Sequence, residues 1–444
     1  MGNRVSYSSR KGENVMSAAV VFLIFVICLV IAIPVSIALS VGAVLPGAFD
    51  PSFAASGTYV IRSMLGGLDS FPLLAVPMFV LSGIVMARGG ISKRLFDVFV
   101  YFMGRKTAGM PCAVIVTCLF YGAISGSAPA TVAAVGSMTI PILVEMGYDK
   151  TFSTAVVAVA GGLGVIIPPS IPFIMYGMAS GCSVSDLFLA GIVPGILIGV
   201  LLMVYSYFYC KKHGEDEEKK GKMVSDLREK GFLRVFRESA LALLSPIIIL
   251  GCIYSGVASP TEAAVISVFY ALAVSIFAYK TIRFSNLWDI LSEALRTFAP
   301  ILFILAASVA FSRVLTLMQV PQGVNAFIME RFSNKILLLI VINLFLLVVG
   351  MVMDTTPAIL ILTPILMPIV TSAGVDPVHF GIIMVVNLAI GFVTPPIGVN
   401  LFVASSLSEI PVMPIAKEAM PMILYFLAAL MLITFIPALS LILI

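Results

Sequence analysis

Long uninterrupted runs of apolar residues constrain this chain more than any other feature of its sequence. A helix needs about 20 apolar residues to cross the core of a bilayer. Clear candidates for such spans occur at 18–44, 71–88, 186–210, 240–257, 260–280, 298–316 and 419–443. Because the runs are continuous and do not alternate apolar with polar residues, they exclude a membrane β-barrel. The sequence therefore predicts an all-α polytopic membrane protein.

The composition excludes several other classes of protein. Of the 444 residues, 60% are hydrophobic and only 11% are charged, whereas about a quarter are charged in a soluble domain. The net charge of +4 is too small to indicate a nucleic-acid partner. Two histidines are too few for a multi-histidine metal site, and no H-E-x-x-H motif is present, so neither a zinc protease nor any other enzyme is predicted.

Four further apolar stretches are too long or too interrupted to be simple spans. Two of them contain a Pro-Pro pair and are predicted to be broken helices, at 151–181 and 377–408. The other two have a polar, glycine-containing middle and are predicted to be re-entrant hairpins, at 108–146 and 335–374. Irregular backbone at membrane depth is tolerated only where it lines a cavity or is buried in protein.

The two halves of the chain resemble each other at one constant offset. This offset pairs the two Pro-Pro sequences, and it also pairs Pro141 with Pro368, Gly147 with Gly374, Gly164 with Gly391 and Pro194 with Pro421. An odd number of predicted crossings separates the halves, so we predict two inverted repeats, an arrangement typical of secondary transporters.

The predicted organisation follows from these repeats. It comprises a polar tail (1–17), a first repeat (18–210) with scaffold (18–106), hairpin (108–146), broken helix (151–181) and helix (186–210), a charged cytoplasmic loop (211–239), a linking helix (240–257), and a second repeat (258–444) with hairpin (335–374), broken helix (377–408) and helix (419–443). The basic residues of the tail, of 88–106 and of 211–238 fall on one side in this count, which should be cytoplasmic. The N-terminus is then predicted to be cytoplasmic and the C-terminus periplasmic. The amphipathic segments 52–68, 91–104, 284–297 and 321–333 are predicted to lie along the membrane interface.

Polar residues at the hairpin tips and helix breaks carry the chemistry of a cation site. Small residues let the backbone turn sharply, and proline deprives carbonyls one turn earlier of their N–H partners. The freed carbonyl and hydroxyl oxygens suit an alkali cation, so the repeats predict two sodium sites; helix packing through small residues is the alternative. The predicted sodium-binding residues are Ser125, Gly126, Ser127, Gly164, Pro168, Pro169, Gly350, Thr355, Thr356, Gly391, Thr394 and Pro395.

Charged residues within apolar segments point to substrate contacts. Asp354 stands in an otherwise apolar hairpin, where a carboxylate is costly and so suggests a function; ion coordination, orientation of Arg313, substrate contact and simple capping of the tip are its open roles. Arg313 either meets an anionic substrate or extends to the interface. The predicted substrate-binding residues are Ser170, Asp354, Asn400 and Arg313. Asp149 and Asp376, which each follow a hairpin, are predicted helix N-caps.

At these positions the sequence resembles a known family, the large membrane subunits of tripartite ATP-independent periplasmic (TRAP) transporters. The motifs that carry the resemblance read GAISGSAPAT at 122–131, GYD at 147–149, IIPPS at 166–170, DPVHFG at 376–381 and NLAIGFVTPPIG at 387–398. The resemblance covers nearly the whole chain from about Ala18 to the C-terminus.

The resemblance implies a fold like that of the ion transporter superfamily and an elevator mechanism in the bacterial inner membrane. It implies Na⁺ as the coupling ion, with two or more per cycle, and a small organic-acid substrate such as sialic acid or a C4-dicarboxylate. It also implies two protein partners, a periplasmic substrate-binding protein and a small four-helix membrane subunit. We expect the latter to be a separate chain, since no four further helices precede Ala18. A stand-alone sodium–carboxylate symporter and a purely structural membrane scaffold are the alternatives.

Replacing Pro168 or Pro395 with alanine tests the role of the broken helices. Each substitution should let the helix close and withdraw carbonyl oxygens from an ion site. We expect transport to fall while expression and folding survive, as measured by uptake and by gel filtration in detergent. Normal transport by both variants would contradict coordination by the broken helices.

Overall fold

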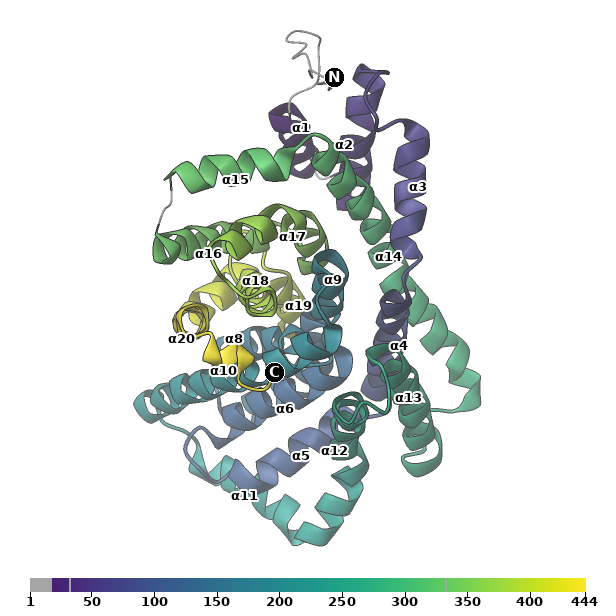
Figure 1. The fold of residues 1–444 in the computed structure, drawn as a ribbon. Coiled ribbons are helices and arrows are strands. Elements are labelled where there is room, and N and C mark those ends of the chain that lie inside the picture. The colour runs from purple at the N-terminus through teal and green to yellow at the C-terminus, as the bar shows by residue number, and fades with distance from the viewer. Residues whose placement is uncertain (1–17, 32, 332–333) are drawn as a thin grey trace, which may run out of the picture.

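Helices make up the regular structure of residues 18–31, 33–331 and 334–444, the part of the chain that the computed structural model describes (Figure 1). In the first half they are α1 (Ala18–Val30), α2 (Val35–Phe49), α3 (Gly57–Leu68), η1 (Phe71–Leu74), α4 (Ala75–Arg88), α5 (Ile91–Met103), α6 (Gly109–Ser125), α7 (Ala128–Glu145), α8 (Lys150–Gly161), η2 (Gly162–Val165), α9 (Ile171–Ser180) and α10 (Val184–His213). In the second half they are α11 (Glu217–Glu229), α12 (Phe232–Tyr254), α13 (Pro260–Ala273), η3 (Val274–Ala278), η4 (Phe284–Asn286), α14 (Leu287–Leu317), α15 (Val320–Arg331), α16 (Lys335–Val352), α17 (Thr355–Ser372), α18 (Pro377–Gly391), α19 (Val399–Ser408), α20 (Val412–Phe435) and α21 (Ala438–Leu441).

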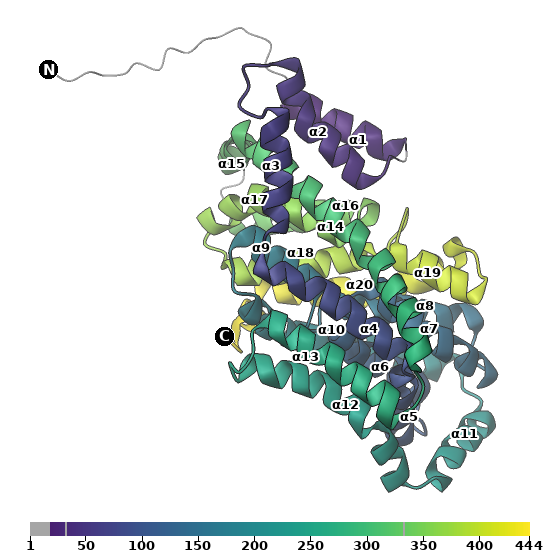
Figure 2. The same ribbon diagram turned by 90° about the vertical axis from the view of Figure 1, so that its right-hand side faces the viewer.

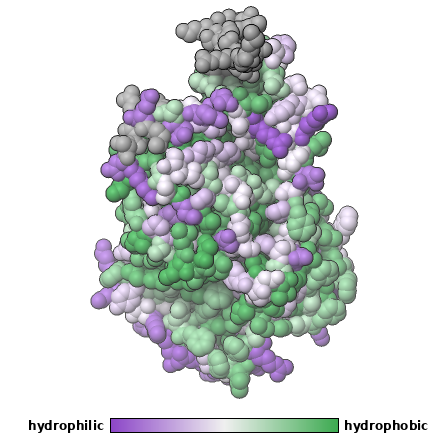
Figure 3. Space-filling view, in the orientation of Figure 1, coloured by the Kyte–Doolittle hydropathy of each residue, from purple (hydrophilic) through white to green (hydrophobic). Residues whose placement is uncertain are grey.

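Within the described residues, nine helical segments are long and apolar enough to cross a membrane. Several of them present large apolar side chains to the outside: Ile247 on α12, Leu344 on α16 and Leu424 on α20 are each about 60% exposed. Hydrophobic side chains accordingly form much of the surface seen in Figure 3. Such exposure is costly in water and favourable against lipid tails, so the described surface fits a bilayer.

The predicted hairpins and broken helices are both present. Helices α6 and α7 form the first hairpin and α16 and α17 the second, while α8–η2–α9 and α18–α19 are the interrupted helices. The two repeats interlock, because α7 packs on α19 and α17 packs on α9. The last helix of each repeat also crosses over, with α10 against α18 and α20 against α8. The predicted fold class, two inverted repeats with two hairpins and two broken helices, is confirmed.

A second group of helices forms a frame along one side of this bundle (Figure 2). The long helix α14 packs against α2, α3, α4 and α17, and α4 packs against α13. Small residues permit the close approach: a Cβ added at Gly67 on α3 would lie 2.8 Å from the Val309 side chain on α14. Phe311 of α14 stacks on Phe25 of α1 with ring centroids 5.6 Å apart. Helix α14 therefore connects the frame to the bundle.

The predicted N-caps are confirmed. The Asp149 carboxylate accepts a hydrogen bond of 2.8 Å from the Phe152 N–H at the start of α8. The Asp376 carboxylate accepts from the Val378 and His379 N–H groups at 2.8 and 3.1 Å at the start of α18. Each cap satisfies orphan donors of a first turn that begins a broken helix, so neither aspartate is needed as an ion ligand.

Three predicted segments differ from the structure. The run 18–44, predicted as one span, is two short helices, α1 and α2, that pack side by side through a short connection at Pro34 (Figures 1 and 2). Most of the predicted amphipathic segment 284–297 forms one continuous helix with the span 298–316; this helix is α14, and Pro300 lies inside it. The predicted charged loop 211–239 is largely helical, as the end of α10, all of α11 and the start of α12.

The first correction bears on the predicted sidedness of the chain ends. Because α2 returns alongside α1, the start of α1 and the end of α2 lie on the same side. The run 18–44 therefore makes either no crossing or two, in place of the one predicted, and the crossing number does not place the N-terminus opposite the C-terminus.

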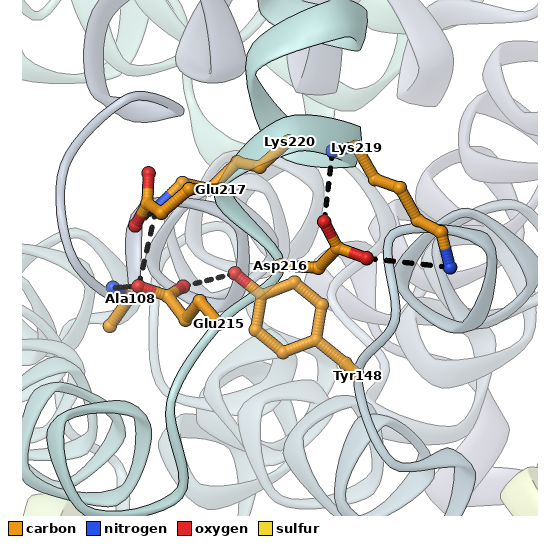
Figure 4. A network of polar contacts seen from close by, with 7 residues as sticks. All are labelled: Ala108, Tyr148, Glu215, Asp216, Glu217, Lys219 and Lys220. Carbon is orange, nitrogen blue, oxygen red and sulfur yellow. Dashed lines mark hydrogen bonds and ion pairs between the residues drawn. The ribbon is translucent and has the colours of Figure 1, made fainter.

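Buried ion pairs order the charged segment and fasten it to the first hairpin (Figure 4). The Glu215 carboxylate accepts hydrogen bonds from the Ala108 N–H at 3.0 Å, from the Lys220 ammonium at 3.3 Å and from the Tyr148 hydroxyl. Lys220 is 1% exposed and also bonds Glu217 at 2.6 Å. Burial and the neighbouring Glu215 raise the pKa of Tyr148, which therefore stays a donor. The segment before α6 and the segment after α7 are thus both bonded to the charged segment between the repeats.

Replacing Glu215 with glutamine should weaken this attachment, since buried Lys220 would lose one of its two carboxylate partners. We expect the free energy of unfolding to fall by about 2–3 kcal/mol, seen as a lower melting temperature in detergent. Glu218→Gln is the matched control, because Glu218 is exposed and forms no ion pair with any described residue. Equal melting temperatures for both variants would contradict a stabilising role for Glu215.

Candidate ion and substrate sites

The tip of the first hairpin is a tight, hydroxyl-lined turn. Gly126 has a left-handed conformation with φ of +61°, which favours glycine. The Ser125 hydroxyl lies 2.9 Å from the Thr131 hydroxyl, which donates to the Ser127 carbonyl at 2.8 Å. Ser125 and Thr131 are buried, and Ser127 is half-buried. The turn therefore brings three hydroxyl-bearing residues and a carbonyl close together.

The first helix break packs directly on this tip. A Cβ at Gly164 would lie 2.4 Å from the Thr131 hydroxyl and 2.9 Å from the Ser127 carbonyl oxygen, so only glycine fits there. The Ile171 N–H donates to the Gly126 carbonyl at 3.2 Å. Pro168 and Pro169, joined by a cis peptide bond, are buried within the break. The structure thus brings the predicted sodium-binding residues of the first repeat together.

The second repeat has the same contact between hairpin and break. A Cβ at Gly391 would lie 2.2 Å from the Gly350 carbonyl carbon, so the backbones of α16 and α18 touch there. Thr355 and Thr356 are buried at the tip. The Thr394 hydroxyl donates to the Ile390 carbonyl at 2.8 Å. The Pro395–Pro396 bond is cis as well, and Pro395 is half-buried in this more accessible break.

Asp354 caps the second hairpin tip. Its carboxylate accepts a hydrogen bond from the Thr355 N–H at 2.6 Å, and its side chain is exposed. Of the roles that the sequence leaves open for Asp354, the structure shows one: its carboxylate caps an accessible hairpin tip. The carboxylate is not bonded to Arg313.

Asn400 joins the second break to the first repeat. It is fully buried at the start of α19, and its side-chain N–H donates to the Ala158 carbonyl of α8 at 3.1 Å. Its side-chain oxygen Oδ1 has no hydrogen-bond partner among the described residues. A buried amide oxygen without a partner costs free energy unless another group satisfies it, so Asn400 has one acceptor oxygen available for a ligand.

Ser170 has a local structural role in this conformation. Its side chain is fully buried, its hydroxyl donates to the Val165 carbonyl at 2.6 Å, and the hydroxyl oxygen accepts from the Phe173 N–H at the start of α9. It lines neither cavity described below, so the structure does not bring it together with Arg313.

Two cavities lie between the bundle and the frame. The larger, of 630 Å³, contains the predicted residue Arg313 and is called the Arg313 cavity; it is lined by the segment before α4, the start of α13, the end of α14, and parts of α9 and α17. The smaller, of 460 Å³, is called the Glu293 cavity and is lined by the end of α4, the start of α14, the first hairpin tip and Ile171.

The two cavities open at opposite ends of the α4–α14 pair. Helices α4 and α14 pack together. The Arg313 cavity is lined by the segment before α4 and the end of α14, and the Glu293 cavity by the end of α4 and the start of α14. Helix α9 separates the cavities, with Ile171 facing the Glu293 cavity and Ile174 the Arg313 cavity. Ser125 and Ser127 lie at the boundary, in the wall of the Glu293 cavity.

Sequence reasoning missed the charged pair at the smaller cavity. Glu293 of α14 lines that cavity and bonds Arg88 of α4. Glu293 lies in a segment predicted only as amphipathic, and the partners are far apart in the chain. Their charges were visible in the sequence, but the packing of α14 on α4 was not.

Replacing Gly391 with alanine should separate the second hairpin from its helix break. The added methyl group would overlap the Gly350 backbone, which cannot move as a side-chain end would. We expect a loss of stability of about 2 kcal/mol together with a loss of transport, measured by thermal unfolding and uptake. Gly251→Ala on α12 is the control, because nothing lies within 4 Å of the added Cβ. Unchanged stability of Gly391→Ala would refute the close contact.

Comparison with known proteins gives a family and a fold. The family model of the DctM component of tripartite ATP-independent periplasmic transporters matches residues 22–439. An isethionate TRAP transporter permease, DctMQ, of Oleidesulfovibrio alaskensis is 44% identical over 94% of this chain, which spans 65% of that relative. The C4-dicarboxylate large permease DctM of Pseudomonas aeruginosa is 40% identical over 84% of this chain and 86% of its own length. The sialic acid large permease SiaM of Vibrio cholerae is 35% identical over 87% and 89%.

Two solved structures share the fold at low sequence identity. The YdaH transporter of Alcanivorax borkumensis aligns with a TM-score of 0.62 and 15% identity, covering 94% of this chain and 98% of that one. MtrF of Neisseria gonorrhoeae aligns with a TM-score of 0.60 and 14% identity, covering 93% and 94%. The predicted family and the transporter fold are confirmed, and the relatives are permeases rather than enzymes. The chain belongs to the DctM family, the large membrane permease subunits of tripartite ATP-independent periplasmic transporters.

Proposed function

We propose that this subunit carries a small organic anion across the bacterial inner membrane, driven by sodium ions bound where each hairpin tip meets its helix break. The observation that carries the proposal is the pairing itself: both repeats bring a hydroxyl-bearing tip against a glycine-lined break. Helix packing alone does not need such polar tips. The partnerless oxygen of Asn400 adds a ligand at the second break.

The cavities support a movement of the bundle against the frame. They lie at opposite ends of the α4–α14 pair, with the first hairpin tip and α9 between them. A bundle that slides along the frame would expose the tip to one cavity and then to the other, which is an elevator mechanism. Arg313 is an exposed cation in the larger cavity, where it would attract a carboxylate or sulfonate group.

Sodium coupling would provide the driving force for uptake. Two sodium ions moving with one monoanion carry one net positive charge inward. The membrane potential then contributes about 2.3 kcal/mol per 100 mV to uptake, in addition to the sodium gradient.

Relatives support the substrate class and the partners. Their names include isethionate, C4-dicarboxylates and sialic acid, all small organic acids. We propose a substrate of this class, a small four-helix membrane subunit and a periplasmic substrate-binding protein as partners. A stand-alone sodium–carboxylate symporter is the competing proposal.

Uptake in proteoliposomes tests this function. Vesicles with this chain and a candidate small subunit would receive labelled isethionate, succinate or sialic acid, each with a matching binding protein, with and without a sodium gradient. We expect uptake that requires both sodium and the binding protein. Sodium-driven uptake without any binding protein would favour the stand-alone symporter, and uptake driven by protons alone would contradict sodium coupling.

The first sodium site has its own test. Ser125→Ala should raise the sodium concentration for half-maximal uptake several-fold, because a buried ligand oxygen is lost. Ser137→Ala is the matched control, since Ser137 lies exposed on the next helix, α7, away from the tip. Identical sodium dependence of the two variants would remove Ser125 from the site.

A further inference from the structure

The two cavities carry opposite charges. Of the residues that the structure describes, Arg313 is the only charged one that lines the larger cavity, and Glu293 is the only charged one that lines the smaller cavity. Arg313 forms no ion pair or hydrogen bond with any described residue, whereas Glu293 is paired with Arg88. An anion therefore meets a free cation in the larger cavity. In the smaller cavity it meets a carboxylate whose cation partner, Arg88, does not line the cavity.

Stability does not explain the Arg88–Glu293 pair. The two side chains are 45% and 44% exposed, and ion pairs with that much solvent contribute little to folding. The helices α4 and α14 that carry them already pack against each other. What the pair does change is the charge beside the hairpin tip, because Glu293 cancels the attraction of Arg88 for anions.

The position of the pair indicates the direction in which it acts. The Glu293 cavity lies at the end of α4 that carries Arg88 and leads directly into α5, with Lys93 and Arg94. An excess of basic residues marks the cytoplasmic side. The Arg313 cavity, at the opposite end, then faces the periplasm.

We propose that the Arg88–Glu293 pair is a release gate, in which Glu293 occupies Arg88 so that the anionic substrate, attracted by Arg313 on the entry side, is not retained on the exit side. This inference rests on the proposed function. It makes Glu293 a positioning residue that controls the availability of Arg88, rather than a ligand of the substrate. The charge difference between the cavities would give the anion a higher affinity on the entry side than on the exit side.

A double-mutant cycle that neutralises each charge in turn tests the gate. Glu293→Gln frees Arg88, so inhibition of uptake by substrate inside the vesicle should strengthen about five-fold and maximal uptake should fall, since one unpaired charge about 4 Å from an anion in water changes binding by about that factor. Arg88→Gln leaves Glu293 alone, so internal inhibition should weaken. The double variant Arg88→Gln/Glu293→Gln restores the balance and should return towards wild type.

A nearby arginine on the same helix provides the matched control. Arg296→Gln removes an exposed cation one turn along α14 that does not line the cavity, and should change nothing. If internal inhibition of the double variant did not return towards the wild-type value, or if neither single variant altered internal inhibition, the gate would be refuted. A purely structural pair would instead lower the melting temperature in all three variants.

A second measurement separates this inference from the proposed function. Isethionate or succinate should raise the melting temperature of the detergent-solubilised Glu293→Gln variant more than that of the wild type, without any partner or gradient. Absence of wild-type uptake would overturn the proposed function, while an equal melting-temperature shift in both proteins would overturn the gate.

Discussion

Every backbone polar group in a bilayer must find its partner within the protein, and the organisation of this molecule depends on that constraint. The chain interrupts its helices at two hairpin tips and two breaks, each of which frees carbonyl and N–H groups. It then packs each break against a tip of the same repeat. The Ile171 N–H donating to the Gly126 carbonyl, and the Gly350–Gly391 backbone contact, show how little space is left at these junctions.

The close packing at these junctions has a functional consequence. Oxygens that remain without partners after such packing, such as Asn400 Oδ1, are buried and directed by rigid neighbours. They are therefore suited to bind a dehydrated cation. Because α7 packs on α19 and α17 on α9, each junction is also supported by the opposite repeat, so that the two proposed sites would move together as parts of one bundle.

The frame contributes a different property, namely asymmetry. The repeats are related by pseudo-symmetry, yet the cavities on either side of α9 contain a free arginine in one case and a glutamate paired with an arginine in the other. In the proposed gate, this difference between a free and a paired charge would give an anion different affinities at the two ends of α4 and α14, without any change in the bundle.

The sequence by itself determined the features that depend on neighbouring residues. The length of the apolar runs predicted most membrane spans, the Pro-Pro pairs predicted the helix breaks, and the polar tips predicted the hairpins. Each of these features depends only on neighbouring residues and on the demands of lipid on the backbone. Asp149 and Asp376 were recognisable as caps for the same reason. Only the tertiary structure decided that 18–44 turns back as α1 and α2, that the charged segment 211–239 is helical and fastened through Glu215, and that Glu293 meets Arg88. Those outcomes depend on contacts between residues far apart in the chain, and composition alone carries no information about which distant helices pack together.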